Sequence, residues 1–184
     1  MDHEMKITDA VPQDARAITN VLHKTWVATY PNKELGITVE DIENSYKDSY
    51  SNEKIQELQD KIANLPNTEK RIVAKEDGLI VGVCSLVKEK ETNRLKTIYV
   101  LPEFQGKGIG TLLWNEIVKF ADPTKDTRVE LATYNQGAVD FYKKLGFVDT
   151  GKRFVDESLI MKNSAAIPEM ELKLSKSNRP NKVL

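Results

Sequence analysis

The spacing of apolar positions changes several times along the chain, and each change predicts an element of secondary structure. Residues 12–29 and 51–65 place apolar side chains three or four positions apart, which is typical of helices that bury one face. Residues 71–76 and 79–87 are strand-like, and the Asp-Gly pair between them favours a two-residue hairpin turn. The second of these strands is apolar on both faces, which indicates a central position in a sheet.

The flanking segments predict further elements. Residues 5–8 form a short opening strand, and Thr38 is a good N-cap for a helix because acidic residues follow it. Three later strands are predicted at residues 128–133, 147–154 and 169–174. Strands and helices thus interleave along the chain, which indicates a single α/β domain.

Two segments near the end of the chain lack a clear pattern. Residues 156–167 are more numerous than a tight hairpin needs, and either a substrate-side loop or a plain excursion into solvent fits them. Residues 175–184 carry basic residues and no acidic residue, which predicts a disordered tail. We therefore expect one domain over residues 1–174.

A buried strand, a glycine-rich turn and a helix follow one another within residues 94–120. Pro102 ends the strand because proline has no N–H to donate to a strand ladder. The turn that follows opens directly into a helix and reads Gln105-Gly106-Lys107-Gly108-Ile109-Gly110. The buried face of that helix is predicted from its spacing to contain Ile109, Leu112, Leu113, Ile117, Val118, Phe120 and Ala121.

A glycine-rich turn at a helix start favours anion binding. The first N–H groups of a helix have no partner within it, and the helix dipole places positive charge there. Phosphate is the natural ligand of such a site. The turn lacks the lysine of a Walker A loop, since Thr111 follows Gly110, and its alternating glycines do not match a dinucleotide-binding fingerprint. The glycines alone leave open a tight connection that binds nothing.

Two motifs in sequence order give the chain a family resemblance. The turn at residues 105–110 resembles the Q/R-x-x-G-x-G/A motif of the GCN5-related N-acetyltransferase (GNAT) family. Downstream, residues 135–147 match that family's N-x-x-A-x-x-F-Y-x-K-x-G-F at every fixed position. The resemblance is good over residues 71–150. It implies the GNAT acyl-CoA acyltransferase fold, a mixed and mostly antiparallel sheet flanked by helices and splayed at the glycine-loop strand.

The resemblance also implies a function. The chain is expected to move an acetyl group from acetyl-CoA, as co-substrate and without a metal, to a primary amine of a small molecule or peptide by direct attack in a ternary complex. A non-catalytic acyl-CoA binding or sensing domain is left open. The residues that the resemblance assigns to acetyl-CoA are Ile98, Tyr99, Val100, Gln105, Gly106, Lys107, Gly108, Ile109, Gly110, Thr111, Asn135 and Lys144.

Tyr142 is the one catalytic residue that the resemblance assigns. Its phenol is expected to act as the general acid that donates to the departing thiolate. A packed aromatic residue beside Phe141 is the alternative. Asn135 is expected to bond the pantetheine arm and to cap its own helix, and Gln105 is expected to act through its backbone.

No general base is assigned. A neutral amine at pH 7 is costly, because an alkyl amine has a pKa near ~10.4. Many relatives place a glutamate on the strand before the glycine loop, but that strand has no carboxylate here. Glu130 is a stand-in candidate, although an exposed or paired strand carboxylate is the favoured interpretation.

The N-terminal helices carry aromatic and acidic residues. In this family the corresponding region walls the acceptor site, so Trp26, Tyr30 and Tyr46 are candidates for substrate contact, with core packing as the favoured alternative. The acidic residues between positions 34 and 48 suit a cationic amine such as a polyamine, although acidic helix faces are also common.

Composition excludes some classes of partner. The chain has 184 residues, of which 27 are basic and 28 acidic, and its net charge of −1 offers no field for nucleic acid or membrane. Cys84 is the single cysteine, so no internal disulfide forms. No signal-peptide pattern or metal-ligand pattern is evident, and a cytoplasmic protein is expected. The sequence leaves open a homodimer.

Overall fold

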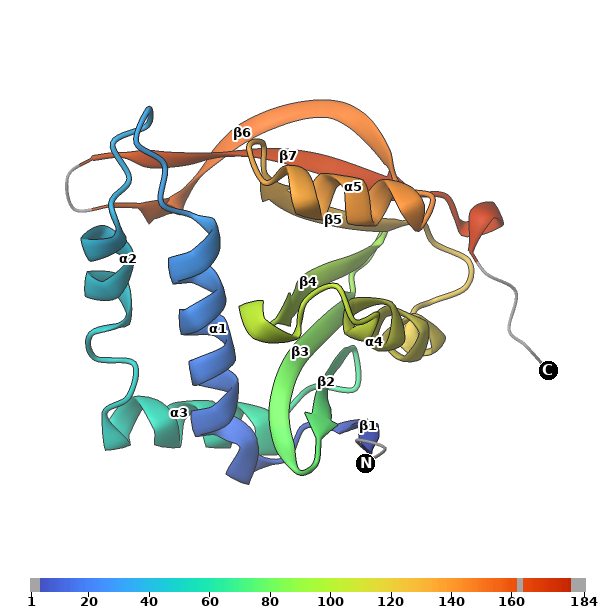
Figure 1. Cartoon of the computed structure of the whole chain (residues 1–184). Helices are drawn as coiled ribbons and strands as arrows, with labels where there is room; N and C mark the ends of the chain where they lie inside the picture. Colours follow the sequence, from blue (N-terminus) through green and yellow to red (C-terminus); the bar gives the residue numbers. More distant parts are fainter. Residues whose placement is uncertain (1–3, 162–163, 180–184) are drawn as a thin grey trace.

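The computed structural model describes residues 4–161 and 164–179, and a seven-stranded sheet organises them (Figure 1). The strand order is β1-β2-β3-β4-β5-β7-β6. The strands are β1 (Met5–Asp9), β2 (Glu69–Glu76), β3 (Leu79–Lys88), β4 (Asn93–Val100), β5 (Thr127–Ala132), β6 (Val148–Ile160) and β7 (Ala166–Leu174).

Strands β4 and β5 make the one parallel pair of this sheet, and they stay together only at its start. Asn93, Arg94 and Leu95 pair with residues 127–129, whereas residues 96–100 have no partner on β5. The other neighbouring strands are antiparallel. The mixed, mostly antiparallel and splayed sheet that was predicted is therefore confirmed, and it opens between the later halves of β4 and β5.

Helices cover both faces of the sheet. They are α1 (Ala15–Thr29), α2 (Val39–Tyr46), α3 (Asn52–Ala63), α4 (Ile109–Ile117) and α5 (Gln136–Lys144). A Cβ on Gly82 would lie 3.0 Å from Leu113 of α4, while the next residue of β3, Val83, lines a recess with Ile18 of α1. Successive strand residues point to opposite faces, so α1 and α4 lie on opposite sides of the sheet.

Several helix and turn signals act as expected. The side chain of Thr38 accepts the Asp41 N–H (3.1 Å), and Asp41 in turn accepts the Thr38 N–H (2.8 Å). This reciprocal pair is a capping box that satisfies free donors at the start of α2. Gly78 has a φ of 84°, as a two-residue hairpin turn requires.

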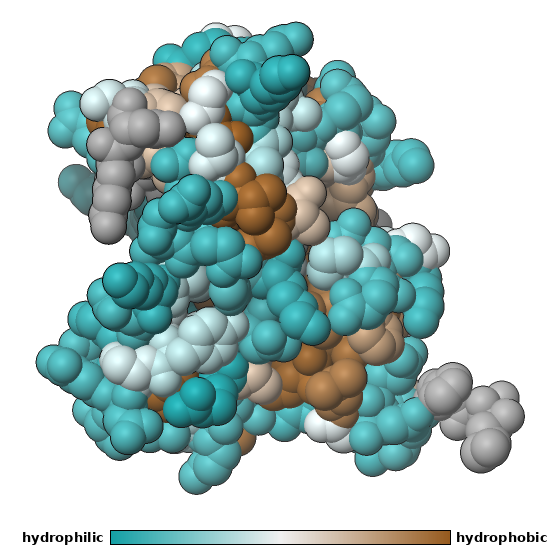
Figure 2. Space-filling view, turned by 60° about the vertical axis from the view of Figure 1, so that its left-hand side comes forward, coloured by the Kyte–Doolittle hydropathy of each residue, from teal (hydrophilic) through white to brown (hydrophobic). Residues whose placement is uncertain are grey.

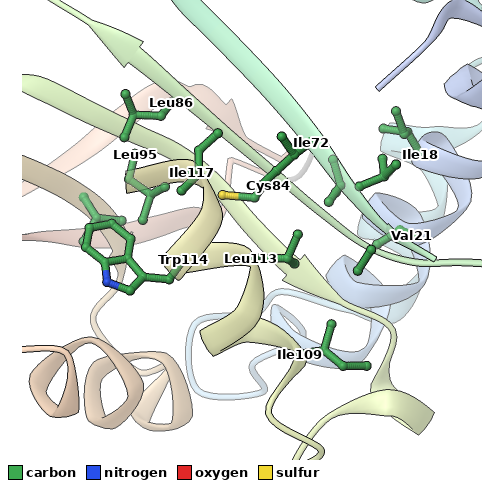
Figure 3. Close-up of a cluster of buried hydrophobic side chains, with 14 of the residues drawn as sticks. Ile18, Val21, Ile72, Cys84, Leu86, Leu95, Ile109, Leu113, Trp114 and Ile117 are labelled. Carbon is green, nitrogen blue, oxygen red and sulfur yellow. The ribbon is translucent and has the colours of Figure 1, made fainter. Parts of the chain in front are cut away.

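The main core lies between the sheet and its helices. Figure 3 shows Leu113 and Ile117 of α4 beside Cys84 of β3, with Ile18 of α1 also in the cluster. The predicted buried face of α4 needs one correction. Trp114 is buried, whereas Leu112 is 45% exposed, because the ring of Trp114 packs edge-on against Phe147.

A second apolar cluster joins two parts of the chain that are distant in sequence. It links the α1–α2 region to the end of the β6–β7 hairpin, and its buried members are Tyr30, Ile37, Ile42, Ala132, Met161 and Ile167. This cluster overturns the expected loop at residues 156–167. Strand β6 runs to Ile160 and β7 begins at Ala166, because the hairpin end is held by this packing. Residues 162–163 of that segment lie outside the described residues.

The start of the expected disordered tail is ordered. Residues 176–178 form a short 3₁₀ helix, and Arg179 donates to the carbonyls of Asp122 (2.8 Å) and Lys125. The expectation fails here because the guanidinium group satisfies carbonyls in the turn before β5. Residues 180–184 lie outside the described part of the chain.

Figure 2 shows a face that is mostly hydrophilic, with apolar residues in separate patches. Across the described residues, no helix has both the length and the apolar character needed to cross a bilayer.

Candidate active site

The glycine turn between β4 and α4 has a left-handed backbone at two positions. Gly106 has a φ of 76° and Gly108 a φ of 82°, and no atom lies within 4 Å of where a Cβ would sit on either. Positive φ is strained for other residues, so the path of the turn requires glycine. Gly108 also caps α4 without a side chain, which leaves the helix start open.

Consecutive main-chain N–H groups in this turn have no acceptor. Among the described residues, no hydrogen bond uses the N–H of any residue from 106 to 111, and the first helical bond runs from Leu112 to the Gly108 carbonyl (3.1 Å). These donors and the positive end of the helix dipole form a cradle for an anion. Lys107 adds a positive charge beside it and lies 4.6 Å from the ring centre of Phe104.

Gly110 connects this cradle to α5. A Cβ at this position would lie 3.3 Å from two ring atoms of Phe141. The absence of a side chain therefore lets α4 and α5 approach each other closely. Gly110 belongs to the first sequence motif and Phe141 to the second, so the two motifs meet in space.

The end of β4 presents main-chain groups to the open side of the sheet. The Leu101 N–H donates to Val81 of β3 (2.9 Å), so by strand alternation the polar groups of Ile98 and Val100 point away from β3. The side-chain amide of Gln105 donates to the Val100 carbonyl (3.0 Å). The side chain of Gln105 thus ties the turn back to β4, while its expected backbone role toward the coenzyme stays a prediction.

Helix α5 begins and ends with the expected caps. The side-chain oxygen of Asn135 accepts the Ala138 N–H (3.1 Å), and its side-chain NH₂ has no acceptor among the described residues. Gly146 has a φ of 91°, and the Phe147 N–H donates to the Tyr142 carbonyl (3.0 Å). This is a Schellman-type ending. Lys144, in the last turn, is exposed.

Tyr142 is both a packed aromatic residue and a protonated phenol. It is 4% exposed. Its ring packs edge-on against those of Phe141 and Phe147, with 5.2 and 5.4 Å between ring centroids. Burial raises its pKa well above the usual value, with smaller contributions from Cys84 and Tyr99. The phenol therefore keeps its proton at neutral pH. Cys84 is buried as well, and burial also raises the pKa of its thiol.

On the other face of the sheet, aromatic residues surround the same opening. The hydroxyl groups of Tyr30 and Tyr99 are 3.0 Å apart, and the Tyr134 hydroxyl donates to the Tyr30 carbonyl (2.8 Å). The rings of Trp26 and Tyr30 lie 4.5 Å apart. Tyr30 is buried, while Trp26 and Tyr46 are partly exposed, so the expected core packing holds most fully for Tyr30.

The two faces are close enough to interact electrostatically. Burial is the main cause of the raised pKa of Tyr30, but Tyr99, Glu169 and Tyr142 all contribute to it. The phenol of Tyr142 on α5 therefore lies within electrostatic reach of the hydroxyl groups on the α1 face.

Glu130 is a paired carboxylate, as favoured from the sequence. It accepts bonds from Arg94 and Arg128 at 2.5 Å each. Arg128 also binds Glu89 (2.9 Å). With its oxygens held by two guanidinium groups, Glu130 forms part of a charge network across β4, β5 and β7.

Glu169 was not singled out from the sequence. It is half-buried on β7, and the structure shows no hydrogen bond or ion pair to its side chain from the described residues. Burial is the first cause of its raised pKa, followed by the charges of Glu130 and Asp156, with Arg94 acting in the opposite direction. No motif marks this residue, and only its pairing opposite Ala132 brings it to the opening.

Metal-ligand clusters are not part of this site as far as it is described. Residues 4–161 and 164–179 contain no group of three or more His, Cys, Asp or Glu side chains placed to hold a metal ion.

Comparison with known sequences identifies the domain. A family model described as an acetyltransferase (GNAT) domain matches residues 29–163. An uncharacterized N-acetyltransferase of Methanocaldococcus jannaschii is 40% identical over 65 residues, which cover 34% of this chain and 29% of that protein. The match therefore spans less than a third of that relative.

Solved structures share the fold over nearly the whole chain. The PaiA N-acetyltransferase of Thermoplasma acidophilum, in complex with coenzyme A, has a TM-score of 0.69 at 24% identity, covering 93% of this chain and 99% of that one. YncA of Salmonella typhimurium, a putative acetyltransferase with its cofactor acetyl-CoA, has a TM-score of 0.65 at 19% identity, covering 98% and 96%. Together with the family model, which matches most of its length, these findings show that the chain belongs to the GNAT family of acetyltransferases.

Proposed function

We propose that this protein transfers an acetyl group from acetyl-CoA to a primary amine of a small molecule or peptide. The observation that carries the proposal is the run of main-chain N–H groups at residues 106–111 without an acceptor among the described residues. Such a cradle suits a diphosphate, and the glycine backbone leaves room for its approach. The residues present thus fit acetyl-CoA, which supplies an acetyl thioester when bound.

The remaining predicted contacts have suitable groups in suitable places. Ile98 and Val100 direct main-chain groups to the open side of β4, where they can bond an amide-containing arm. The free side-chain NH₂ of Asn135 is a further donor, and Lys107 and Lys144 are cations for phosphate groups. Tyr99 lies between Ile98 and Val100 and contributes to coenzyme binding only by positioning them, because its own side chain lies on the α1 face with Tyr30.

Tyr142 is proposed as the general acid. Its protonated phenol donates to the sulfur on which negative charge develops as the thioester is broken. The raised pKa is no obstacle, because burial raises the pKa of a thiol in the same surroundings, as it does for Cys84. The amine attacks directly in a ternary complex, and no covalent acyl-enzyme is proposed.

Two measurements separate an enzyme from an acyl-CoA sensor. Calorimetry with acetyl-CoA tests the cradle, and a thiol-release assay with a panel of primary amines tests transfer. Binding together with amine-dependent release of thiol supports the proposal. Binding without release across a broad panel supports a sensing domain, and failure to bind acetyl-CoA contradicts both. A cytoplasmic location and a homodimer stay predictions.

A further inference from the structure

Glu169 lies where the two halves of the sheet separate. It pairs with Ala132 at the end of β5, three residues beyond the last position at which β5 contacts β4. Glu171 pairs with Glu130 on the same strands. Residues two apart on a strand share a face, so Glu169, Glu171 and Glu130 line one side of the sheet.

Of these three carboxylates, Glu169 is the one with no cation in the described structure. Glu130 is held by Arg94 and Arg128. Glu171 lies 3.5 Å from Lys152 and 3.7 Å from Arg128. A half-buried carboxylate without a partner is costly, and a ligand that brings a positive charge relieves that cost.

Hydroxyl groups and aromatic rings lie near this carboxylate, because its strand partner Ala132 packs in the cluster that contains Tyr30, against which Trp26 and Tyr46 also pack. Its charge contributes to the raised pKa values of Tyr30 and Tyr99, whose first cause is burial, so Glu169 lies within electrostatic reach of both phenols. Trp26 packs against Tyr30, and the ring centroids of Tyr46 and Trp26 lie 6.0 Å apart. Aromatic faces attract cations, with Trp the strongest. This surrounding favours an organic cation over a bare metal ion.

The aromatic residues near Glu169 lie within electrostatic reach of the catalytic phenol. Tyr142 contributes to the raised pKa of Tyr30, and Tyr99 contributes to that of Tyr142. Glu169 and Tyr142 therefore approach one pair of tyrosines from β7 and from α5. A free carboxylate on β7 and a protonated phenol on α5 thus act electrostatically on the same pair of tyrosines.

We propose that Glu169 binds the ammonium group of the acceptor and takes its proton, beside aromatic side chains that favour a primary alkylammonium. This inference rests on the proposed acetyl transfer and names the acceptor class and the base for it. The charged and titratable groups within electrostatic reach of Glu169 are Glu130, Asp156, Arg94, Tyr30 and Tyr99.

The proton and electron pairs balance in one sequence. Glu169 accepts a proton from the R–NH₃⁺ group and becomes a neutral carboxylic acid. The freed nitrogen lone pair forms the C–N bond to the acetyl carbonyl carbon, and the C–S bond breaks with its electron pair on sulfur. Tyr142 donates its proton to that sulfur and regains one as the amide nitrogen loses its second. The net products are an acetamide, a free thiol and one proton, which Glu169 releases to solvent.

Glu130 is the rival base, and its bonding argues against it. Two guanidinium groups at 2.5 Å occupy its oxygens, so accepting a proton would break two charge-assisted hydrogen bonds. Glu169 gives up no such bond. The raised pKa of Glu169 also brings it nearer to that of an amine, which favours proton transfer.

The test compares E169Q with E171Q in the full chain. Probe amines are butylamine, 1,4-diaminobutane and phenethylamine, with acetyl-CoA as donor. We expect E169Q to lower kcat/KM at pH 7 by about 10²–10⁴-fold, as for loss of a general base. The loss should shrink by about tenfold per pH unit as pH approaches the amine's own pKa of ~10.4, where a base is no longer needed. E171Q, which removes a paired carboxylate from the same face, should keep the wild-type pH profile.

Two further measurements keep the inference separate from the proposed function. Calorimetry without coenzyme should show that E169Q binds butylamine at least tenfold more weakly than E171Q does, while both bind acetyl-CoA like wild type. E169Q should not be less stable than wild type at pH 7, because it removes a charge that the fold holds unfavourably.

Some results would overturn the assignment of Glu169. A pH profile of E169Q parallel to that of wild type would do so, as would E130Q alone showing the pH-dependent loss. If wild type acetylates none of the amines, the proposed function fails, and calorimetry still decides the amine site. Equal binding of butylamine by E169Q and E171Q would then reject it.

Discussion

The opening between β4 and β5 has two sides that are built in different ways. On the α4–α5 side, the cradle consists of consecutive main-chain N–H groups from residues 106–111, and Gly110 packs on Phe141 of the second motif. On the α1 side, the proposed amine site combines Tyr30 from the end of α1, Tyr99 from β4 and Glu169 from β7. The first side is a local property of the chain, and the second exists only after folding.

This difference explains which ligand the sequence reveals. A diphosphate is bound by backbone geometry, which needs glycines at fixed spacing and therefore leaves a motif. An amine is bound by side-chain charge and aromatic surface, which any strand or helix can contribute from any distance in sequence. The acetyl donor can therefore be predicted from the sequence, whereas the amine acceptor depends on the tertiary structure.

Among changes outside the proposed amine site, removing the phenol of Tyr142 should have the largest effect. We expect Y142F to lower kcat by about 10²–10³-fold, the usual result of deleting one donor to a developing anion. Affinity for acetyl-CoA should stay the same, because the ring and its contacts with Phe141 and Phe147 remain. Steady-state kinetics and calorimetry check both values. A wild-type kcat in Y142F would leave Tyr142 as packing alone.

Breaking the joint at Asn93, which ties the start of β4 to the turn before β5, should have the next largest effect. The buried side-chain NH₂ of Asn93 donates to the carbonyls of Asp122, Lys125 and Asp126, and its oxygen accepts the Asp122 N–H (2.7 Å). We expect N93A to lower the free energy of unfolding by about 3 kcal/mol, because several buried partners lose their bonds.

Denaturant unfolding measures that loss. Asn64 at the end of α3 provides the matched control, since its exposed side chain makes one bond to the Asp60 carbonyl (2.8 Å). N64A should cost less than about 1 kcal/mol. Equal losses in N93A and N64A would show that the joint is not a special point of the fold.

Backbone strain in the cradle should weaken the binding of acetyl-CoA more modestly. Alanine at Gly108, with its φ of 82°, costs about 1–2 kcal/mol and turns the N–H groups from their native directions. We expect G108A to bind acetyl-CoA about tenfold more weakly, as measured by calorimetry. G151A introduces the same strain at a φ of 81° on β6, also with open surroundings, and should not change affinity. An equal effect of the two would argue against the cradle.

The smallest expected effect is a change in the pKa of Asp122. Hydrogen bonds from the side chain and backbone of Thr124 lower the pKa of Asp122 from 3.8 to about 2. Because the pKa of Asp122 is lower in the folded state, its ionised carboxylate stabilises the fold at pH values above the unfolded pKa. That stabilisation is lost as pH falls from about 4 to about 2. T124V should raise the pKa toward 3.8 and weaken this acid dependence, while the joint at Asn93 stays intact. Titration by NMR checks the shift, and an unmoved pKa would contradict its cause.

Local signals predicted much of the fold. The caps at Thr38 and Asn135, the hairpin at Gly78 and the left-handed ending at Gly146 all depend on neighbouring residues, and the structure has each of them. Errors occurred where distant packing decides. Trp114 replaced Leu112 in the core because Phe147 meets it from another element.

The late hairpin shows the same limit. Residues 156–160 and 166–167 are strand rather than loop, because Met161 and Ile167 pack with Tyr30 and its neighbours near the start of the chain. Arg179 is held at the turn before β5 for a similar reason. No pattern in these segments reports a partner more than fifty positions away.

By itself, the sequence determined the family, the glycine cradle and the order of strands and helices, because backbone conformation depends on adjacent residues. Only the tertiary structure decided which carboxylate meets the opening in the sheet. Glu130 and Glu169 are similar in sequence, since each is a glutamate on a late strand. Folding pairs one with two arginines and leaves the other free beside aromatic residues, and charge interactions depend on those distances in space.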